Sequence, residues 1–115
     1  MPKRTLAADG MPLPVSVELA QIGESIRMAR KRRDLTQADL ARMMFVTPRT
    51  VVRLEKGEPG VSLAVFLTAL FCLNLKHEVS SLFAPDKDAV GINMDVRKHG
   101  RRKQVHKPKN DALDF

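Results

Sequence analysis

Arg49 and Arg53 stand four residues apart in the middle of the chain, a spacing that suits the reading of a nucleic acid. Residues four apart share one face of a helix. Just before them, Thr47 and Pro48 favour a helix start, because threonine caps a helix N-terminus and proline fits the first helical position. An arginine projected from the first turns of such a helix can donate two hydrogen bonds to O6 and N7 of a guanine. Thr50 also lies away from the inward positions and is a further candidate for contact with a base or a phosphate.

The elements that must position these arginines are two short helices joined by a tight turn. Thr36 can cap the first helix, with Asp39 in place of the usual capping-box glutamate. Only Phe45 and Val46 separate the two periodic segments, and Gly57 is placed to end the second. Helices this short must pack on each other at a steep angle, as in a helix-turn-helix unit; the alternative is an ordinary helical hairpin in a small bundle. The side chains expected to face inward are Leu40, Ala41, Met44, Val51 and Leu54.

Two motifs at this spacing carry a resemblance to a known family. They read L-T-Q-A-D-L-A at Leu35–Ala41 and R-L-E-K-G at Arg53–Gly57. Over roughly residues 16–84 the chain resembles the XRE-type, or lambdoid-repressor-like, DNA-binding domains. The resemblance implies an all-α, five-helix lambda-repressor-like fold, and it implies double-stranded DNA as the ligand.

The resemblance also implies roles for particular residues. It places Pro48 beside Arg49 and Arg53 among the base-reading positions, although a proline can contact only a thymine methyl group. It pairs Arg30 with Glu55 in an ion pair that locks the first helix to the recognition helix. The predicted phosphate contacts are Gln37, which matches the family's phosphate-binding glutamine, Thr47 and Lys56.

Two positions depart from the family pattern. Phe45 stands in the turn where glycine is usual because φ is positive, and a phenylalanine there should cost about 1 kcal/mol. We therefore expect either a rebuilt turn or a buried ring that offsets the strain. The loop Glu58-Pro59-Gly60 lacks the basic residues that some relatives use for DNA contacts, which weakens the case for a contact from it.

Composition favours a polyanionic partner. The 115 residues include 20 Lys and Arg against 13 Asp and Glu, giving a net charge of +7 and a pI of about 10.1. Nucleic acid is therefore the first expectation and a membrane surface the second. One cysteine excludes an internal disulfide, and neither a signal peptide nor an apolar run of the ~20 residues that span a bilayer is evident. We expect a bacterial cytoplasmic protein, nucleoid-associated when bound to DNA.

Three regions are expected: a flexible arm at residues 1–15, the helix-turn-helix domain at 16–84, and a short strand with a basic tail at 85–115. A first helix is predicted at Ser16–Arg33. A fourth, at Leu63–Leu73, is apolar nearly all round, so one side requires cover from outside the domain. We expect that cover to come from a second copy of the chain, or alternatively from residues 86–115 folding back. The predicted dimer or partner surface consists of Val65, Phe66 and Cys72 with Val79 and Phe83 of a fifth helix at Lys76–Phe83.

The last thirty residues change character. Ala89–Val96 alternates weakly and could form one short strand, which would need a partner strand. Arg97–Lys109 holds seven Lys and Arg and no acid, a composition that is usually disordered alone and binds polyanions. The pattern P-D-x-D-x-V-G at Pro85–Gly91, the basic tail and the final Asp-Phe look similar to HipB-like antitoxins, which repress their own operon and bind HipA-type serine/threonine kinase toxins.

The predicted function is a sequence-specific, homodimeric DNA-binding repressor on a palindromic operator, and the antitoxin of a HipBA-type module. The alternatives are a stand-alone phage-type repressor and a protein-inhibiting interaction module that binds DNA non-specifically. An enzyme is not expected, since the three histidines lack metal-ligand spacing and no glycine-rich phosphate loop is present. No cofactor and no metal are expected.

Overall fold

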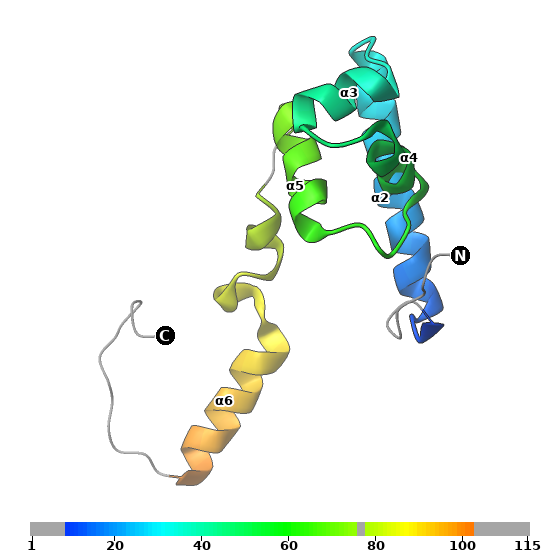
Figure 1. The fold of residues 1–115 in the computed structure, drawn as a ribbon. Helices are drawn as coiled ribbons and strands as arrows, with labels where there is room; N and C mark the ends of the chain where they lie inside the picture. Colours follow the sequence, from blue (N-terminus) through cyan, green and yellow to red (C-terminus); the bar gives the residue numbers. More distant parts are fainter. Residues whose placement is uncertain (1–8, 76–77, 103–115) are drawn as a thin grey trace. The chain divides into compact units, whose positions relative to one another are not determined.

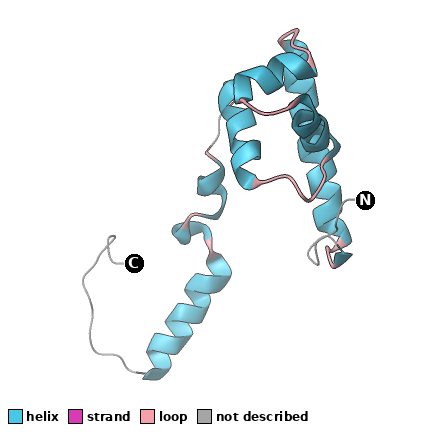
Figure 2. Ribbon diagram, viewed as in Figure 1, coloured by secondary structure: helices cyan, strands magenta, loops and turns pink. Residues whose placement is uncertain are grey.

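Helices make up every regular element that the structure describes. The structure is a computed structural model, and it describes residues 9–75 and 78–102. The elements are α2 (Leu13–Arg32), α3 (Gln37–Met44), α4 (Pro48–Lys56), α5 (Leu63–Cys72), two 3-10 helices at Val79–Phe83 and Pro85–Lys87, and α6 (Ala89–Arg102) (Figures 1 and 2). The predicted all-α class is confirmed. Within the described ranges, no helix has both the length and the apolar composition that crossing a bilayer requires.

The chain divides into two units, Met1–His77 and Glu78–Phe115. In the first unit α4 packs against both α2 and α3, and α3 also packs against α5 (Figure 1). The five side chains expected to face inward from the two short helices all lie in this core. Its buried apolar members are Ile26, Ala29, Leu40, Ala41, Met44, Val51, Leu54, Ala69, Leu70 and Leu73.

Side-chain caps define where the short helices begin. The Thr36 hydroxyl accepts the backbone N–H of Asp39 at 3.0 Å, and the Asp39 carboxylate accepts the backbone N–H of Thr36 at 2.8 Å, so the predicted capping box is present. The hydrogen bonds from Thr36 to the Asp39 carboxylate, chiefly the one from the backbone N–H, lower the pKa of Asp39. The nearby Arg42 lowers it further. The hydroxyls of Thr47 and Ser62 cap α4 and α5 by accepting the backbone N–H of Thr50 and of Val65. Each helix start therefore satisfies N–H groups that have no partner within the helix.

The first described helix begins earlier than predicted. α2 starts at Leu13, with Pro12 at the N-cap and Pro14 in the first turn, inside the stretch expected to be a flexible arm. Prolines favour coil in most positions, but a first-turn proline lacks only an N–H that the helix leaves unbonded. The predicted arm before residue 9 lies outside the described residues.

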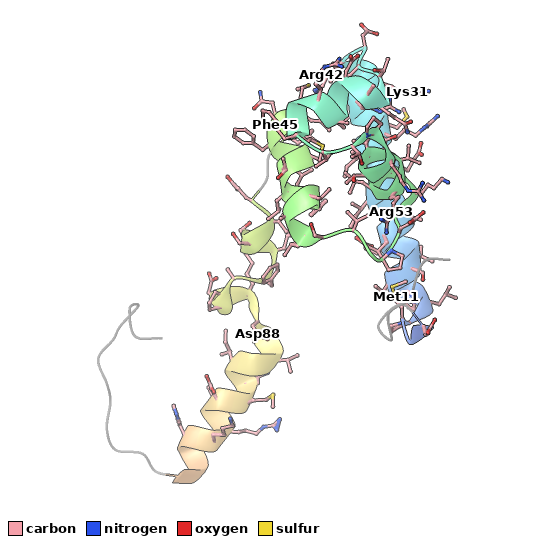
Figure 3. All side chains as sticks on the ribbon, in the orientation of Figure 1. Met11, Lys31, Arg42, Phe45, Arg53 and Asp88 are labelled. Carbon is pink, nitrogen blue, oxygen red and sulfur yellow. The ribbon has the colours of Figure 1, made fainter. Side chains whose placement is uncertain are left out.

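Neither outcome expected for Phe45, a rebuilt turn or a buried ring, is found in the turn between α3 and α4. Its φ is 58°, so the turn keeps the left-handed conformation. Its side chain is 94% exposed, so burial of the ring does not offset the strain (Figure 3). Asp34, after α2, also adopts a positive φ of 55°, a conformation that aspartate tolerates better than most residues.

The predicted strand at Ala89–Val96 is wrong, because these residues form the first half of α6. A lone strand leaves its backbone groups without partners, whereas a helix satisfies its own. Asp88 assists the start of the helix by accepting the backbone N–H of Gly91 at 2.9 Å. In the predicted fifth helix, Val79–Phe83 is a 3-10 helix and residues 76–77 lie outside the description, as does the predicted basic tail from residue 103 onward.

Candidate nucleic-acid interface

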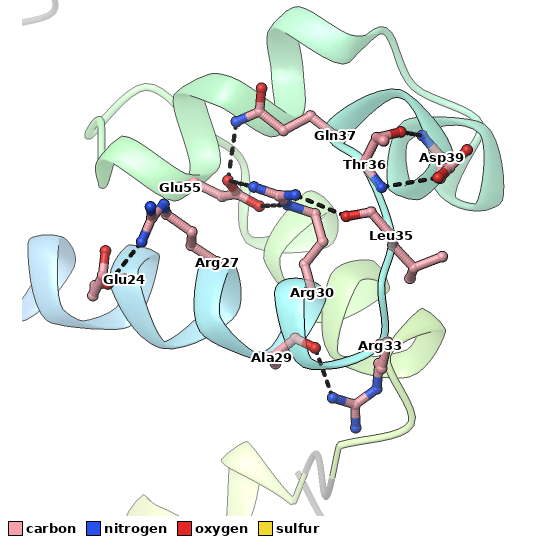
Figure 4. A network of polar contacts seen from close by, with 10 residues as sticks. All are labelled: Glu24, Arg27, Ala29, Arg30, Arg33, Leu35, Thr36, Gln37, Asp39 and Glu55. Atoms are coloured by element: carbon pink, nitrogen blue, oxygen red, sulfur yellow. Dashed lines mark hydrogen bonds and ion pairs between the residues drawn. The ribbon is translucent and has the colours of Figure 1, made fainter.

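A buried ion pair ties the recognition helix α4 to the end of α2. The guanidinium of Arg30 donates from Nε to Glu55 Oε2 at 2.7 Å and from Nη2 to Glu55 Oε1 at 3.0 Å (Figure 4). The two residues are only 7% and 8% exposed. Hydrogen bonding to Glu55 and its negative charge raise the pKa of Arg30 against the opposing effect of burial. Arg30 Nη1 also donates to the carbonyl of Leu35 at 2.8 Å, so one side chain joins α2, α4 and the loop between α2 and α3.

Gln37, a predicted phosphate contact, is part of the same network. Its Nε2 donates to Glu55 Oε1 at 3.0 Å, from the first residue of α3 (Figure 4). One of its two amide hydrogens is used in this bond, which leaves the other for a phosphate oxygen. The contact orients Gln37 and links all three helices at Glu55. Sequence spacing gave no signal for this bond, because the two residues lie in different helices.

Two glycines allow α4 to approach α2 at backbone distance. A Cβ added at Gly23 would lie 2.4 Å from the carbonyl oxygen of Glu55 and 2.8 Å from that of Leu54. At Gly57, where φ is +73°, a Cβ would lie 2.5 Å from the carbonyl oxygen of Leu19. Since these neighbours are backbone atoms, no side-chain movement can relieve the clash. The crossing of α2 and α4 therefore fixes the tilt of the recognition helix.

The opposite face of α4 carries the predicted base-reading arginines. Val51, Leu54 and Glu55 are buried, whereas Arg49 is exposed and Arg53 partly exposed. A shallow hollow on this outer face is lined by Arg49, Val52, Arg53, Lys56 and Glu58. The structure thus brings the two arginines together with Lys56, and Figure 3 labels Arg53 on this helix. Such a face supplies donors for base edges and charge for phosphates.

The start of α4 uses its two threonines internally. The Thr47 hydroxyl accepts the backbone N–H of Thr50 at 3.3 Å and lies 3.1 Å from the Thr50 hydroxyl. Thr47 therefore serves as the cap and Thr50 is bonded to it, while both hydroxyls keep lone pairs for an outside partner. Pro48, also predicted to face a base, is exposed at the first position of the helix.

Glu58 is a residue of this face that sequence reasoning missed. Its Oε1 accepts a hydrogen bond from Arg53 Nε at 2.9 Å. The lack of basic residues in the loop gives no sign that one of its acids engages Arg53. The pairing depends on the fold of the loop after α4, which the spacing of five residues does not reveal.

The predicted dimer or partner residues do not form one exposed set. Val65, Phe66 and Cys72 are half-buried on or beside the core, and the Cys72 thiol donates to the carbonyl of Met43 at 3.5 Å. Val79 and Phe83 belong to the second unit, where Phe83 is exposed. On α5 the most exposed large side chains recur every four residues, at Leu63, Leu67 and Phe71. Composition alone could not separate these faces, since nearly every residue of α5 is apolar.

A tight turn between two short helices, with a buried inner face and a basic outer face on the second, defines a helix-turn-helix domain. The comparison with known families agrees: residues 26–69 match the helix-turn-helix family model. The match supports an XRE-type, DNA-binding helix-turn-helix over these residues and favours it over an ordinary helical hairpin. The matched segment contains Arg30, Glu55 and every candidate DNA contact named above. No curated protein matches the chain significantly. Within the described ranges, no three His, Cys, Asp or Glu side chains are grouped so as to hold a metal ion.

Proposed function

We propose that this protein is a sequence-specific transcriptional repressor that binds a palindromic operator as a homodimer, without catalysing a reaction, in a bacterial cytoplasm. The observation that carries the proposal is the two-sided character of α4. Its inner side is fixed by Glu55 and Arg30, so its outer side presents Arg49 and Arg53 at a constant tilt. A net charge of +7 supplies the sequence-independent attraction to phosphates on which specific reading builds.

Replacing Arg49 or Arg53 with alanine is expected to weaken operator binding by about 1–3 kcal/mol and to relax the sequence preference. Each arginine can form a bidentate pair with a guanine, and alanine cannot. The operator is first obtained by selection from a random duplex library, and affinities for it and for a scrambled duplex are then measured by gel shift at two salt concentrations. As the control, Lys56→Ala should weaken both duplexes about equally and reduce the salt slope by about one. Unchanged discrimination in both arginine variants would contradict the assignment.

The homodimer is supported by the exposed stripe of α5. Leu63, Leu67 and Phe71 recur at the spacing that places side chains on one helix face, and all three are exposed. A two-fold pair can cover two such stripes with each other, because the same patch serves both copies. The two recognition helices would then meet half-sites spaced by about 34–36 Å or a multiple of it.

Replacing Leu67 with glutamate is expected to convert the dimer to a monomer, because the new carboxylate would be buried without a partner in the interface. Sedimentation equilibrium measures the mass, and a footprint on the selected operator measures the loss of two-fold protection. Met28→Glu is the matched control, since Met28 is an equally apolar, exposed residue of α2. A wild-type chain that sediments as a monomer, or a footprint on one asymmetric site, would contradict the dimer.

The antitoxin role rests on the C-terminal part of the chain. Beyond the pattern at Pro85–Gly91, the second unit has surplus apolar surface: Val90, Ile92, Met94 and Val96 of α6 are all exposed. A HipA-like kinase is the partner proposed for this unit. Co-expression with a HipA-like kinase followed by purification distinguishes an antitoxin from a stand-alone phage-type repressor, since only the antitoxin would co-purify with the kinase. A pure interaction module would instead show salt-dependent affinity that does not vary with DNA sequence.

A further inference from the structure

The loop after α4 is fastened to Arg53 through both its backbone and a side chain. At the helix end, Gly57 adopts a positive φ, its N–H donates to the carbonyl of Leu54 at 3.0 Å, and the N–H of Glu58 donates to that of Arg53 at 3.1 Å. This pair of bonds is the Schellman arrangement, which turns the chain back over the last helical turn. The Glu58 carboxylate then accepts from Arg53 Nε at 2.9 Å. Glu58 is therefore bonded to Arg53 twice: its N–H to the Arg53 carbonyl, and its carboxylate to the Arg53 side chain.

Gly60 limits the guanidinium of Arg53 from a second direction. A Cβ added at Gly60 would lie 3.0 Å from Arg53 Nη2, which is tighter than an ordinary contact. The bare backbone at this position thus gives the guanidinium the room that it occupies. The turn is closed by the N–H of Val61, which donates to the carbonyl of Glu58 at 3.3 Å. The Arg53 guanidinium therefore has the Glu58 carboxylate at its Nε and the backbone of Gly60 beside its Nη2.

This arrangement leaves the outer edge of the guanidinium available for DNA. Glu58 engages Nε, and no hydrogen bond from the described residues engages Nη1 or Nη2 of Arg53. Those two nitrogens form the edge that can donate in parallel to O6 and N7 of a guanine. The Arg53 and Glu58 side chains are 43% and 40% exposed, so the edge can meet a base without unfolding the loop.

We propose that Glu58 is a positioning residue for sequence reading: it holds Arg53 in the rotamer whose Nη edge faces a guanine, and Gly60 preserves the space for that rotamer. The inference rests on the proposed base-reading role of Arg53. An arginine already held in one conformation loses less side-chain entropy on binding, which favours the cognate base over a mismatched one.

A purely electrostatic role for Glu58 makes the opposite prediction. A carboxylate beside a DNA-binding face repels phosphates, so its removal would raise affinity for every duplex alike. A positioning role predicts that removal lowers the ratio of specific to non-specific affinity, whatever happens to total affinity. Glu58→Ala and Glu58→Gln distinguish the two, because both remove one negative charge but only glutamine keeps an Oε1 acceptor for Arg53 Nε.

The test measures the affinity of the full-length variants for three duplexes. They are the selected operator, the operator with a substitution at the base pair where Arg53→Ala relaxes the preference, and a scrambled duplex. Glu58→Ala is expected to reduce discrimination at that base pair about tenfold, the lower end of what a bidentate contact supplies. Glu58→Gln should stay within about threefold of wild type in discrimination. Gly60→Ala carries no charge change and should also reduce discrimination, with an unaltered salt slope, because its Cβ displaces the guanidinium.

NMR of the free protein gives a readout independent of DNA. The Arg53 Nε–H signal should exchange slowly in wild type and in Glu58→Gln, and rapidly in Glu58→Ala. Equal discrimination in Glu58→Ala and wild type, or equal changes in the alanine and glutamine variants, would overturn the positioning role. Arg53→Ala tests base reading by Arg53 separately from positioning by Glu58. If this variant leaves discrimination unchanged, base reading by Arg53 is contradicted. If Arg53→Ala lowers discrimination and Glu58→Ala does not, only the positioning role fails.

Discussion

Replacing Glu55 with alanine is expected to destabilise the first unit by about 3–5 kcal/mol. The variant leaves the guanidinium of Arg30 in a site where it is only 7% exposed, without its two carboxylate bonds, and Gln37 loses its acceptor. A small domain has a total stability of about 5–15 kcal/mol, so the loss is a large part of the whole. The Coulomb attraction of the pair is lost as well, but the main cost is a buried positive charge that is left with only the Leu35 carbonyl as a partner.

Urea denaturation followed by far-UV circular dichroism measures this loss. Glu24→Ala is the matched control, because Glu24 pairs with Arg27 at 3.1 Å but both side chains are well exposed. That control should lose less than about 1 kcal/mol. The double variant Arg30→Met/Glu55→Leu should recover much of the stability, since a well-packed apolar replacement removes the unpaired charge. A loss in Glu55→Ala no larger than in Glu24→Ala would contradict the structural role of the pair.

Replacing Gly23 with alanine is expected to cost about 3 kcal/mol or more. Helix propensity alone predicts the opposite sign, because alanine in a helix interior is favoured over glycine by about 1 kcal/mol. The steric term decides, since the new Cβ would lie 2.4 Å from the carbonyl oxygen of Glu55 and its other close neighbours are also backbone. The helices must separate to admit it, and the separation also lengthens the bonds between Arg30 and Glu55.

Thermal and urea unfolding measure the effect of Gly23→Ala, with Gly100→Ala as the chemically identical control. Gly100 lies in α6, and a Cβ there meets nothing within 4 Å. The control should therefore be neutral or slightly stabilising through propensity alone. A stabilised Gly23→Ala variant would show that α2 and α4 do not cross as closely as described.

The parts of the fold that sequence predicts well are those determined by neighbouring residues. Thr36 and Asp39 form a capping box within one turn, and the inward positions of α3 and α4 follow from a spacing of three and four. The failures have equally local causes. Pro14 is compatible with coil and with the first turn of a helix, and the alternation in Ala89–Val96 is too short to distinguish a strand from the helix that forms.

The candidate site is predictable to the same extent. Arg49 and Arg53 could be placed on the outer face because the inner face was already occupied by Val51 and Leu54. The ion pair of Arg30 and Glu55 came from the family resemblance, not from spacing. The bonds from Gln37 to Glu55 and from Arg53 to Glu58 depend on how separate segments meet, and no periodicity in the sequence encodes them.

The backbone contact at Gly23 has a consequence for how such a protein can acquire a new operator. The close backbone contacts with α2 are made at Leu54, Glu55 and Gly57, whereas Arg49, Val52 and Arg53 line the hollow on the outer face. On the proposed base-reading role, variation at these three positions is expected to change the bases that are contacted, while the tilt of α4 stays constant. A library randomised there, in an otherwise untouched chain, is expected to yield folded variants with altered DNA targets.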